Sequence, residues 1–180
     1  MTLREQVARL PKTMRPQDAA YFDGLKGKHK GLPLFIIGTG PSLRNEVGKD
    51  INILGELESK GRCVTFGVNL LMHCMLAEDA FMDFTPRYWG MGEIDWLFKI
   101  DMELTGLHTE RILSCMWPPE TFKDEKLRAN WRWIPRPYEH MMTDGHFMGF
   151  GGELPYLADG QSVVFDTGVQ LGAWMGCDPV

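Results

Sequence analysis

Short apolar runs alternate along this chain with segments in which apolar residues recur at helical spacing. The runs predict strands at residues 34–37, 62–68, 80–88, 111–115 and 131–134. Pro86 interrupts the third run, and proline has no N–H to give to a strand ladder. The periodic segments predict helices at residues 50–59, 94–104, 120–129 and 162–175. Strands that alternate with helices indicate an α/β fold, in which a mostly parallel sheet is flanked by helices on both faces.

Helical patterning also precedes the first strand. Leu3, Val7 and Leu10 fall on one helical face. Further apolar positions follow Pro16, namely Ala19, Ala20, Phe22 and Leu25. We therefore expect an N-terminal helical segment at residues 1–31 and a single α/β domain at residues 32–180.

The pattern dissolves over residues 135–160, where histidines and methionines stand among glycines. A loop of this length is uncommon in a compact domain unless it has a function. We therefore expect an active-site lid, with a disordered insertion as the alternative. Beyond the final helix, Val180 stands where the next core strand should begin. We expect a chain truncated at its C-terminus or a sheet completed by a partner chain, which leaves a homo-oligomer open.

The composition is that of a soluble globular domain, with 180 residues, 44% of them hydrophobic and 24% charged. A net charge of −5 argues against a nucleic-acid partner, which favours a basic surface. No apolar run approaches the ~18 residues of a membrane span, and the N-terminus lacks a signal-peptide core, so we expect a cytoplasmic protein. The cysteines lack the paired spacing of a metal site and are expected to be buried free thiols: Cys63, Cys74, Cys115 and Cys177.

The segment after the first apolar run carries the most informative pattern. Residues 34–37 lead into a Gly38–Gly40 turn, and the Pro-Ser-Leu of residues 41–43 suits a first helical turn. A strand, a glycine turn and a helix start form a phosphate cradle, because backbone N–H groups and the helix N-terminus point at one place. A glycine turn without a ligand is the alternative. The residues expected to bind a nucleotide phosphate are Gly38, Thr39, Gly40, Pro41 and Ser42.

The familiar phosphate-binding fingerprints do not fit this turn. The dinucleotide fingerprint needs a third glycine where Leu43 stands, and an acid at the end of the next strand, where Asn69 stands. A P-loop needs an upstream glycine and a hydroxyl residue after its lysine, and the Gly-Lys-Asp of residues 48–50 has neither.

Other residues carry candidate binding chemistry. Asn69, at the carboxyl end of a strand, can hydrogen-bond a base or ribose, or act as a strand-end cap. Ser162 can bind a second anionic group or act as an N-cap, and Arg136 can neutralise a phosphate. Trp131 and Trp133 share one face of a strand and can form a stacking surface for a base.

Two histidines in residues 135–160, His140 and His146, are candidate catalytic bases. Solvated loop histidines are the alternative. Their spacing, with Asp144 between them, fits no standard zinc pattern, so no metal site is expected.

Three motifs carry a resemblance to known families. Residues 36–43, Ile-Ile-Gly-Thr-Gly-Pro-Ser-Leu, are similar to the opening motif of the Campylobacter-type bacterial sialyltransferases and of the glycosyltransferase-like motility accessory factor family. Archaeal 6-hydroxymethyl-dihydropterin diphosphokinases share its Gly-x-Gly-Pro-Ser-Leu signature. Residues 66–69 resemble the second strand of these families, which ends in an Asn that contacts the nucleotide. Residues 160–176 resemble their Gly-Ser-Val-containing helix, which leads to a Leu-Gly and the next strand.

The resemblance implies a Rossmann-like domain that binds a nucleotide diphosphate or a nucleotide-sugar. In the sialyltransferases the donor is a cytidine monophosphate (CMP) sugar, and a histidine beyond the last shared strand is the general base, so its counterpart would lie outside this chain. The diphosphokinases use ATP and magnesium. We therefore expect a nucleotide-sugar-dependent glycosyltransferase-like protein. A diphosphokinase-like phosphoryl transferase and a non-catalytic nucleotide-binding fragment are the alternatives.

Overall fold

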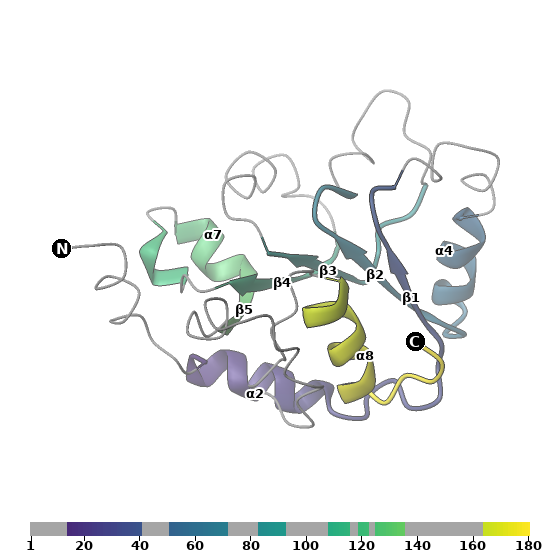
Figure 1. The fold of residues 1–180 in the computed structure, drawn as a ribbon, viewed down its shortest axis with the longest axis horizontal. Coiled ribbons are helices and arrows are strands. Elements are labelled where there is room, and N and C mark those ends of the chain that lie inside the picture. The colour runs from purple at the N-terminus through teal and green to yellow at the C-terminus, as the bar shows by residue number, and fades with distance from the viewer. Residues whose placement is uncertain are drawn as a thin grey trace, which may run out of the picture.

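Five parallel strands form the centre of the fold. The computed structural model describes residues 14–40, 51–71, 83–92, 108–115, 119–122, 125–135 and 164–180. The strands are β1 (Leu34–Ile37), β2 (Val64–Val68), β3 (Tyr88–Met91), β4 (Glu110–Cys115) and β5 (Trp131–Pro135). They are hydrogen-bonded in the order β1-β2-β3-β4-β5, and each neighbouring pair is parallel. All the carboxyl ends therefore lie at one edge of the sheet (Figure 1).

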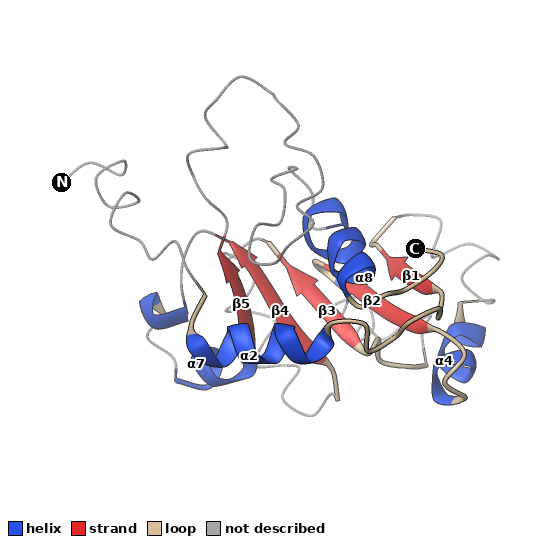
Figure 2. Ribbon diagram, turned by 90° about the horizontal axis from the view of Figure 1, so that it is seen from below, coloured by secondary structure: helices blue, strands red, loops and turns tan. Residues whose placement is uncertain are grey.

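Helices cover both faces of this sheet. They are α2 (Pro16–Leu25), α4 (Asn52–Ser59), η2 (Pro119–Thr121), α7 (Glu125–Asn130), the π-helix η4 (Val164–Val169) and α8 (Gln170–Trp174). Figure 2 shows α2 and α8 on the same face, where Phe22 of α2 and Leu171 of α8 share one buried core with strand residues such as Phe66. On the other face, α4 packs through Leu54 against a second buried cluster, which includes Ile37 of β1. The expected α/β architecture is confirmed.

None of the helices in the described ranges is both long and apolar enough to cross a membrane.

Several predicted elements have different bounds in the structure. The single helix expected at residues 162–175 is, within the described residues, divided into η4 and α8. The strand expected within residues 80–88 begins only at Tyr88, because Pro86 cannot contribute an N–H to the ladder and stands before the strand. The helix expected at residues 120–129 is divided into η2 and α7. The expected helix at residues 94–104 and the expected lid, apart from Pro135 at the end of β5, lie outside the described residues.

Two glycines let the last helix approach β1 closely. A Cβ atom at Gly168 would lie 2.9 Å from the Cδ1 atom of Ile36, and one at Gly172 would lie 2.5 Å from the Cδ2 atom of Leu34. The later glycine is beside the earlier strand residue, so η4 and α8 run antiparallel to β1. The N-terminus of η4 is therefore directed toward the carboxyl end of β1.

The residues after α8 return along β1. The N–H of Asp178 donates to the carbonyl of Leu32, and the N–H of Leu34 donates to the carbonyl of Pro179, both at 2.9 Å. Backbone groups of successive strand residues point to alternate sides of the strand. The Pro33 carbonyl points toward β2, where it accepts the N–H of Val64, so the Leu32 carbonyl and the Leu34 N–H point away from β2. Residues 178–179 thus lie along the outer edge of β1, just before Val180, at which the sequence predicts that a further strand begins.

Candidate functional site

The carboxyl edge of the sheet brings two of the predicted binding regions together. Ile37 of β1 pairs with Gly67 of β2, so Gly38 and Val68, the residue before Asn69, come next along these two strands. A Cβ atom built on Gly38 would lie 3.9 Å from the Cγ2 atom of Val68. The glycine turn and Asn69 are therefore neighbours, although about thirty residues separate them in the sequence.

Neither backbone conformation nor packing requires glycine at position 38. Its φ is not positive, and the 3.9 Å contact of an added Cβ is ordinary van der Waals separation. Thr39 and Gly40, which follow, are exposed. What glycine does provide here is a bare backbone, which a ligand can approach without meeting a side chain.

Asn69 has the features of a residue held in place for binding. Its φ of 50° is in the left-handed region, and it is the only non-glycine residue there in the described part of the chain. Its Oδ1 atom is buried and has no hydrogen-bond partner among the residues that the structure describes. A buried acceptor without a partner costs roughly 1–3 kcal/mol, and strained backbone tends to occur at functional sites. Both observations favour a ligand role over that of a strand-end cap.

Residue 69 is held through its backbone by β3. Its N–H donates to the carbonyl of Gly90 at 2.9 Å, and its own carbonyl accepts a hydrogen bond from Nε1 of Trp89 at 2.8 Å. The Trp89 ring is fully buried and packs against Trp131, with 4.9 Å between the ring centroids. Sequence reasoning did not identify Trp89, because a tryptophan in an apolar strand gives no sign of which carbonyl it will reach.

The N-terminus of η4 is directed toward the same edge. Gly168 lies beside Ile36, and η4 begins earlier in the chain, at Val164, further toward the carboxyl end of β1. Helix N-termini present free N–H groups and a partial positive charge, which favour an anion. Single π-helical turns are also frequent at functional sites.

Several predicted site residues cannot be placed. Pro41, Ser42, Arg136, His140, His146 and Ser162 lie outside the described residues. The expected stacking surface is wrong, because Trp131 and Trp133 are fully buried in the sheet's packing. Their shared face meets the protein interior and not a ligand.

Cys63 and Cys177 are free and buried, as expected. Burial raises the pKa of both thiols, that of Cys177 to about 11. Among the residues that the structure describes, no group of three or more His, Cys, Asp or Glu side chains is arranged to hold a metal ion.

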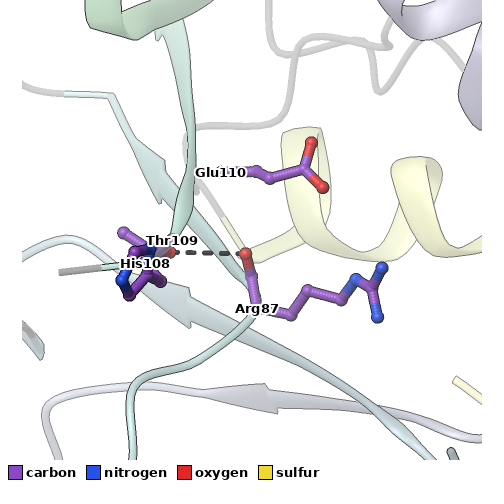
Figure 3. A pocket seen from close by; sticks show the side chains of 4 residues that line it. All are labelled: Arg87, His108, Thr109 and Glu110. Carbon is purple, nitrogen blue, oxygen red and sulfur yellow. Dashed lines mark hydrogen bonds between the residues drawn. The ribbon is translucent and has the colours of Figure 1, made fainter.

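A pocket of about 480 Å³ lies at the opposite edge of the sheet, at the amino ends of β3 and β4. Arg87, His108, Thr109 and Glu110 line it, and Figure 3 shows the Arg87 and Glu110 side chains extending toward the same side. The Thr109 hydroxyl donates to the Arg87 carbonyl at 3.4 Å. The sequence pattern does not predict this pocket, because polar and charged residues at the amino ends of two strands are common at any protein surface.

The polar side chains beside this pocket contact other side chains of the protein. The Tyr21 hydroxyl donates to Glu110, whose other carboxylate oxygen is 3.9 Å from Lys28 Nζ. His29 hydrogen-bonds the Tyr88 hydroxyl at 2.8 Å, and burial raises the pKa of Tyr88 to about 12. Because the Glu110 carboxylate is engaged by the Tyr21 and Lys28 side chains, the carboxyl edge is the stronger candidate for a ligand site.

Searches against protein-family models, curated proteins and solved structures found no match to this chain, so its function has to be argued from the carboxyl edge of the sheet itself.

Proposed function

We propose that this protein binds the phosphate of a nucleotide at the Gly38–Ser42 turn and transfers a sugar from a nucleotide-sugar. The observation that carries this proposal is Asn69, whose left-handed backbone and unpartnered Oδ1 atom lie beside the glycine turn. An acceptor without a partner calls for a donor on the ligand, such as a ribose hydroxyl or a base amino group.

The phosphate has a separate set of partners in this proposal. The backbone of Gly38, Thr39 and Gly40 and the start of η4 supply N–H groups, which stabilise the charge of a departing nucleotide phosphate. Pro41 and Ser42 would continue the cradle, Ser162 would bind a second anionic group, and Arg136 would neutralise charge.

The reaction needs a base as well as a cradle. The acceptor hydroxyl oxygen attacks the anomeric carbon of the sugar, the bond from that carbon to the phosphate oxygen breaks, and the nucleotide leaves with the electron pair. The proton of the acceptor passes to a base, for which His140 and His146 are the candidates in this chain. ATP with magnesium would replace the nucleotide-sugar if the protein is instead a diphosphokinase-like enzyme.

The first test is a thermal-shift and calorimetric panel with CMP, CDP, UDP, GDP, ATP and ATP with magnesium. A ligand at ~100 times its dissociation constant should raise the free energy of unfolding by roughly 2.7 kcal/mol. Selective binding of CMP or another transferase nucleotide supports sugar transfer, and selectivity for ATP with magnesium supports phosphoryl transfer. Binding of no nucleotide contradicts both.

The variant for this panel is Gly38→Ala. The added methyl has space within the protein, so the ligand-free protein should keep its melting temperature, while nucleotide affinity falls at least about tenfold, equivalent to ~1.4 kcal/mol. Gly24→Ala is the matched control, because it adds the same methyl in open space on α2. Equal affinity of the two variants would argue that the glycine turn is only a turn.

A further inference from the structure

We propose that Trp89 is the positioning residue of the nucleotide site, acting through Asn69. This inference rests on the proposed function and adds a residue that does not itself touch the ligand. The indole Nε1–H of Trp89 donates to the carbonyl of Asn69 at 2.8 Å, while the neighbouring Gly90 carbonyl accepts the N–H of Asn69.

The left-handed turn at residue 69 explains why the indole is needed. The N–H of Asn69 makes the last ladder bond between β2 and β3. At a φ of 50° the chain leaves the strand direction, so the carbonyl of Asn69 does not continue the ladder. The Trp89 indole satisfies that carbonyl and thereby fixes the peptide plane that follows the Asn69 side chain.

Packing fixes the indole itself. Trp89 and Trp131 are both fully buried, and their rings are tilted by 56° with centroids 4.9 Å apart. A buried ring held by a second ring has little rotamer freedom. The position of the Asn69 amide is therefore set by β3 and β5, which lie one and three strands away from β2.

The test uses Trp89→Phe, which keeps an aromatic ring and removes the indole N–H. Affinity for the nucleotide that the unmodified protein binds best in the panel should fall about 2- to 12-fold, the ratio that corresponds to one hydrogen bond. Trp174 lies on α8, and its Nε1–H also donates to a backbone carbonyl, that of Phe22, at 2.7 Å. Trp174→Phe is therefore the matched control. Its affinity should stay unchanged.

A double-mutant cycle separates positioning from general destabilisation. In an Asn69→Gly background the amide is absent, so Trp89→Phe should cause no further loss of affinity. A loss as large as in the unmodified background would overturn the proposal, as would an equal loss in Trp174→Phe.

Two NMR measurements complete the test. In the unmodified protein, the Trp89 indole N–H resonance should shift on nucleotide binding while that of Trp174 does not. Without any nucleotide, the order parameter of the Asn69 side-chain NH2 group should fall in Trp89→Phe and stay unchanged in Trp174→Phe, because only the first variant releases the Asn69 carbonyl. If no nucleotide binds but the order parameter falls, the proposed function fails and the Trp89–Asn69 link stands. If the order parameter does not fall, Trp89 does not hold Asn69.

Discussion

Asn69 combines two local costs that the fold tolerates. Its backbone is left-handed, and its buried Oδ1 atom finds no partner in the described part of the chain. Asparagine adopts this conformation more readily than most residues, but glycine adopts it without steric cost. A residue chosen for stability alone would therefore be glycine.

This difference gives a prediction for Asn69→Gly. The variant should raise the free energy of unfolding by about 1 kcal/mol, since removing the strain and the orphaned acceptor outweighs the extra chain entropy of glycine. Nucleotide affinity should fall in the same variant. Chemical denaturation and calorimetry measure the two effects.

Asn130→Gly is the matched control, because Asn130 ends α7 and does not have a positive φ. That variant should gain no stability. A loss of stability in Asn69→Gly would mean that the side chain at position 69 supports the fold and not a ligand.

At the scale of single residues, the sequence indicates where along a strand a residue lies, but not its backbone conformation or its hydrogen-bond partners. Asn69 can be identified because it follows an apolar run, and carboxyl ends of parallel strands carry ligand groups. Its backbone conformation and its indole partner depend on how β3 docks beside β2. That docking is a tertiary contact between residues 20 positions apart, which no local pattern encodes.

Among the elements, the packing of η4 and α8 on β1 controls where the helix N-terminus lies. Gly172 allows this approach, since a Cβ atom there would lie 2.5 Å from Leu34 Cδ2. Gly172→Ala should therefore lower the free energy of unfolding by about 1–3 kcal/mol, as overpacked cores do. Thermal or urea unfolding measures the change.

Gly24→Ala again supplies the comparison, because it lies in a helix with no atom within 4 Å of the added methyl. It should raise stability by about 0.5–1 kcal/mol, since alanine is the better helix former. If Gly172→Ala were equally stabilising, the close contact between α8 and β1 would not exist in solution.

Strands were predictable where the burial of an apolar run is the dominant interaction. The apolar runs of β1, β2, β4 and β5 are confirmed, because a strand buried on both faces has no polar alternation. The prediction for β3 began too early in the chain, because the apolar run extends across Pro86. Proline has no N–H to pair with β2, and β3 begins only after it. The π-helical form of η4 has no signal in the periodicity, since the same residues also fit an α-helix.

For the molecule as a whole, residues 27–34 fasten α2, the sheet and α8 to one another. The N–H groups of Gly27, His29 and Gly31 donate, respectively, to the carbonyls of Trp174, Met175 and Gly176. The His29 side chain is buried there and bonded to the Tyr88 hydroxyl. Burial, and then the positive charges of Arg87 and Lys28, lower the pKa of His29, against the opposing effect of Glu110.

The lowered pKa of His29 predicts how stability depends on pH. In the unfolded chain a histidine titrates near its ordinary value of about 6.5, whereas in the folded protein His29 stays neutral to lower pH. Between the two pKa values the unfolded state binds more protons, so the free energy of unfolding should fall as pH falls below about 6.5. Denaturant unfolding across this range measures the slope.

His29→Gln should reduce that slope, because glutamine can bond Tyr88 without titrating. His108→Gln is the comparison variant, because it makes the same substitution at an exposed histidine at the pocket edge. An unaltered slope in His29→Gln would show that other groups cause the pH dependence.

The course of residues 178–179 has a consequence for the topology. Among the described strands, the sheet proceeds from β1 through β2 to β5, while the chain that leaves α8 returns to the other side of β1. The connection from β1 to β2 contains α4, and the connection from β5 to residues 178–179 contains α8, so these two connections have their helices on opposite faces of the sheet. Such a reversal is a topological switch point, where loops diverge and leave a crevice at the carboxyl end of the strand. In this molecule that position is occupied by Gly38.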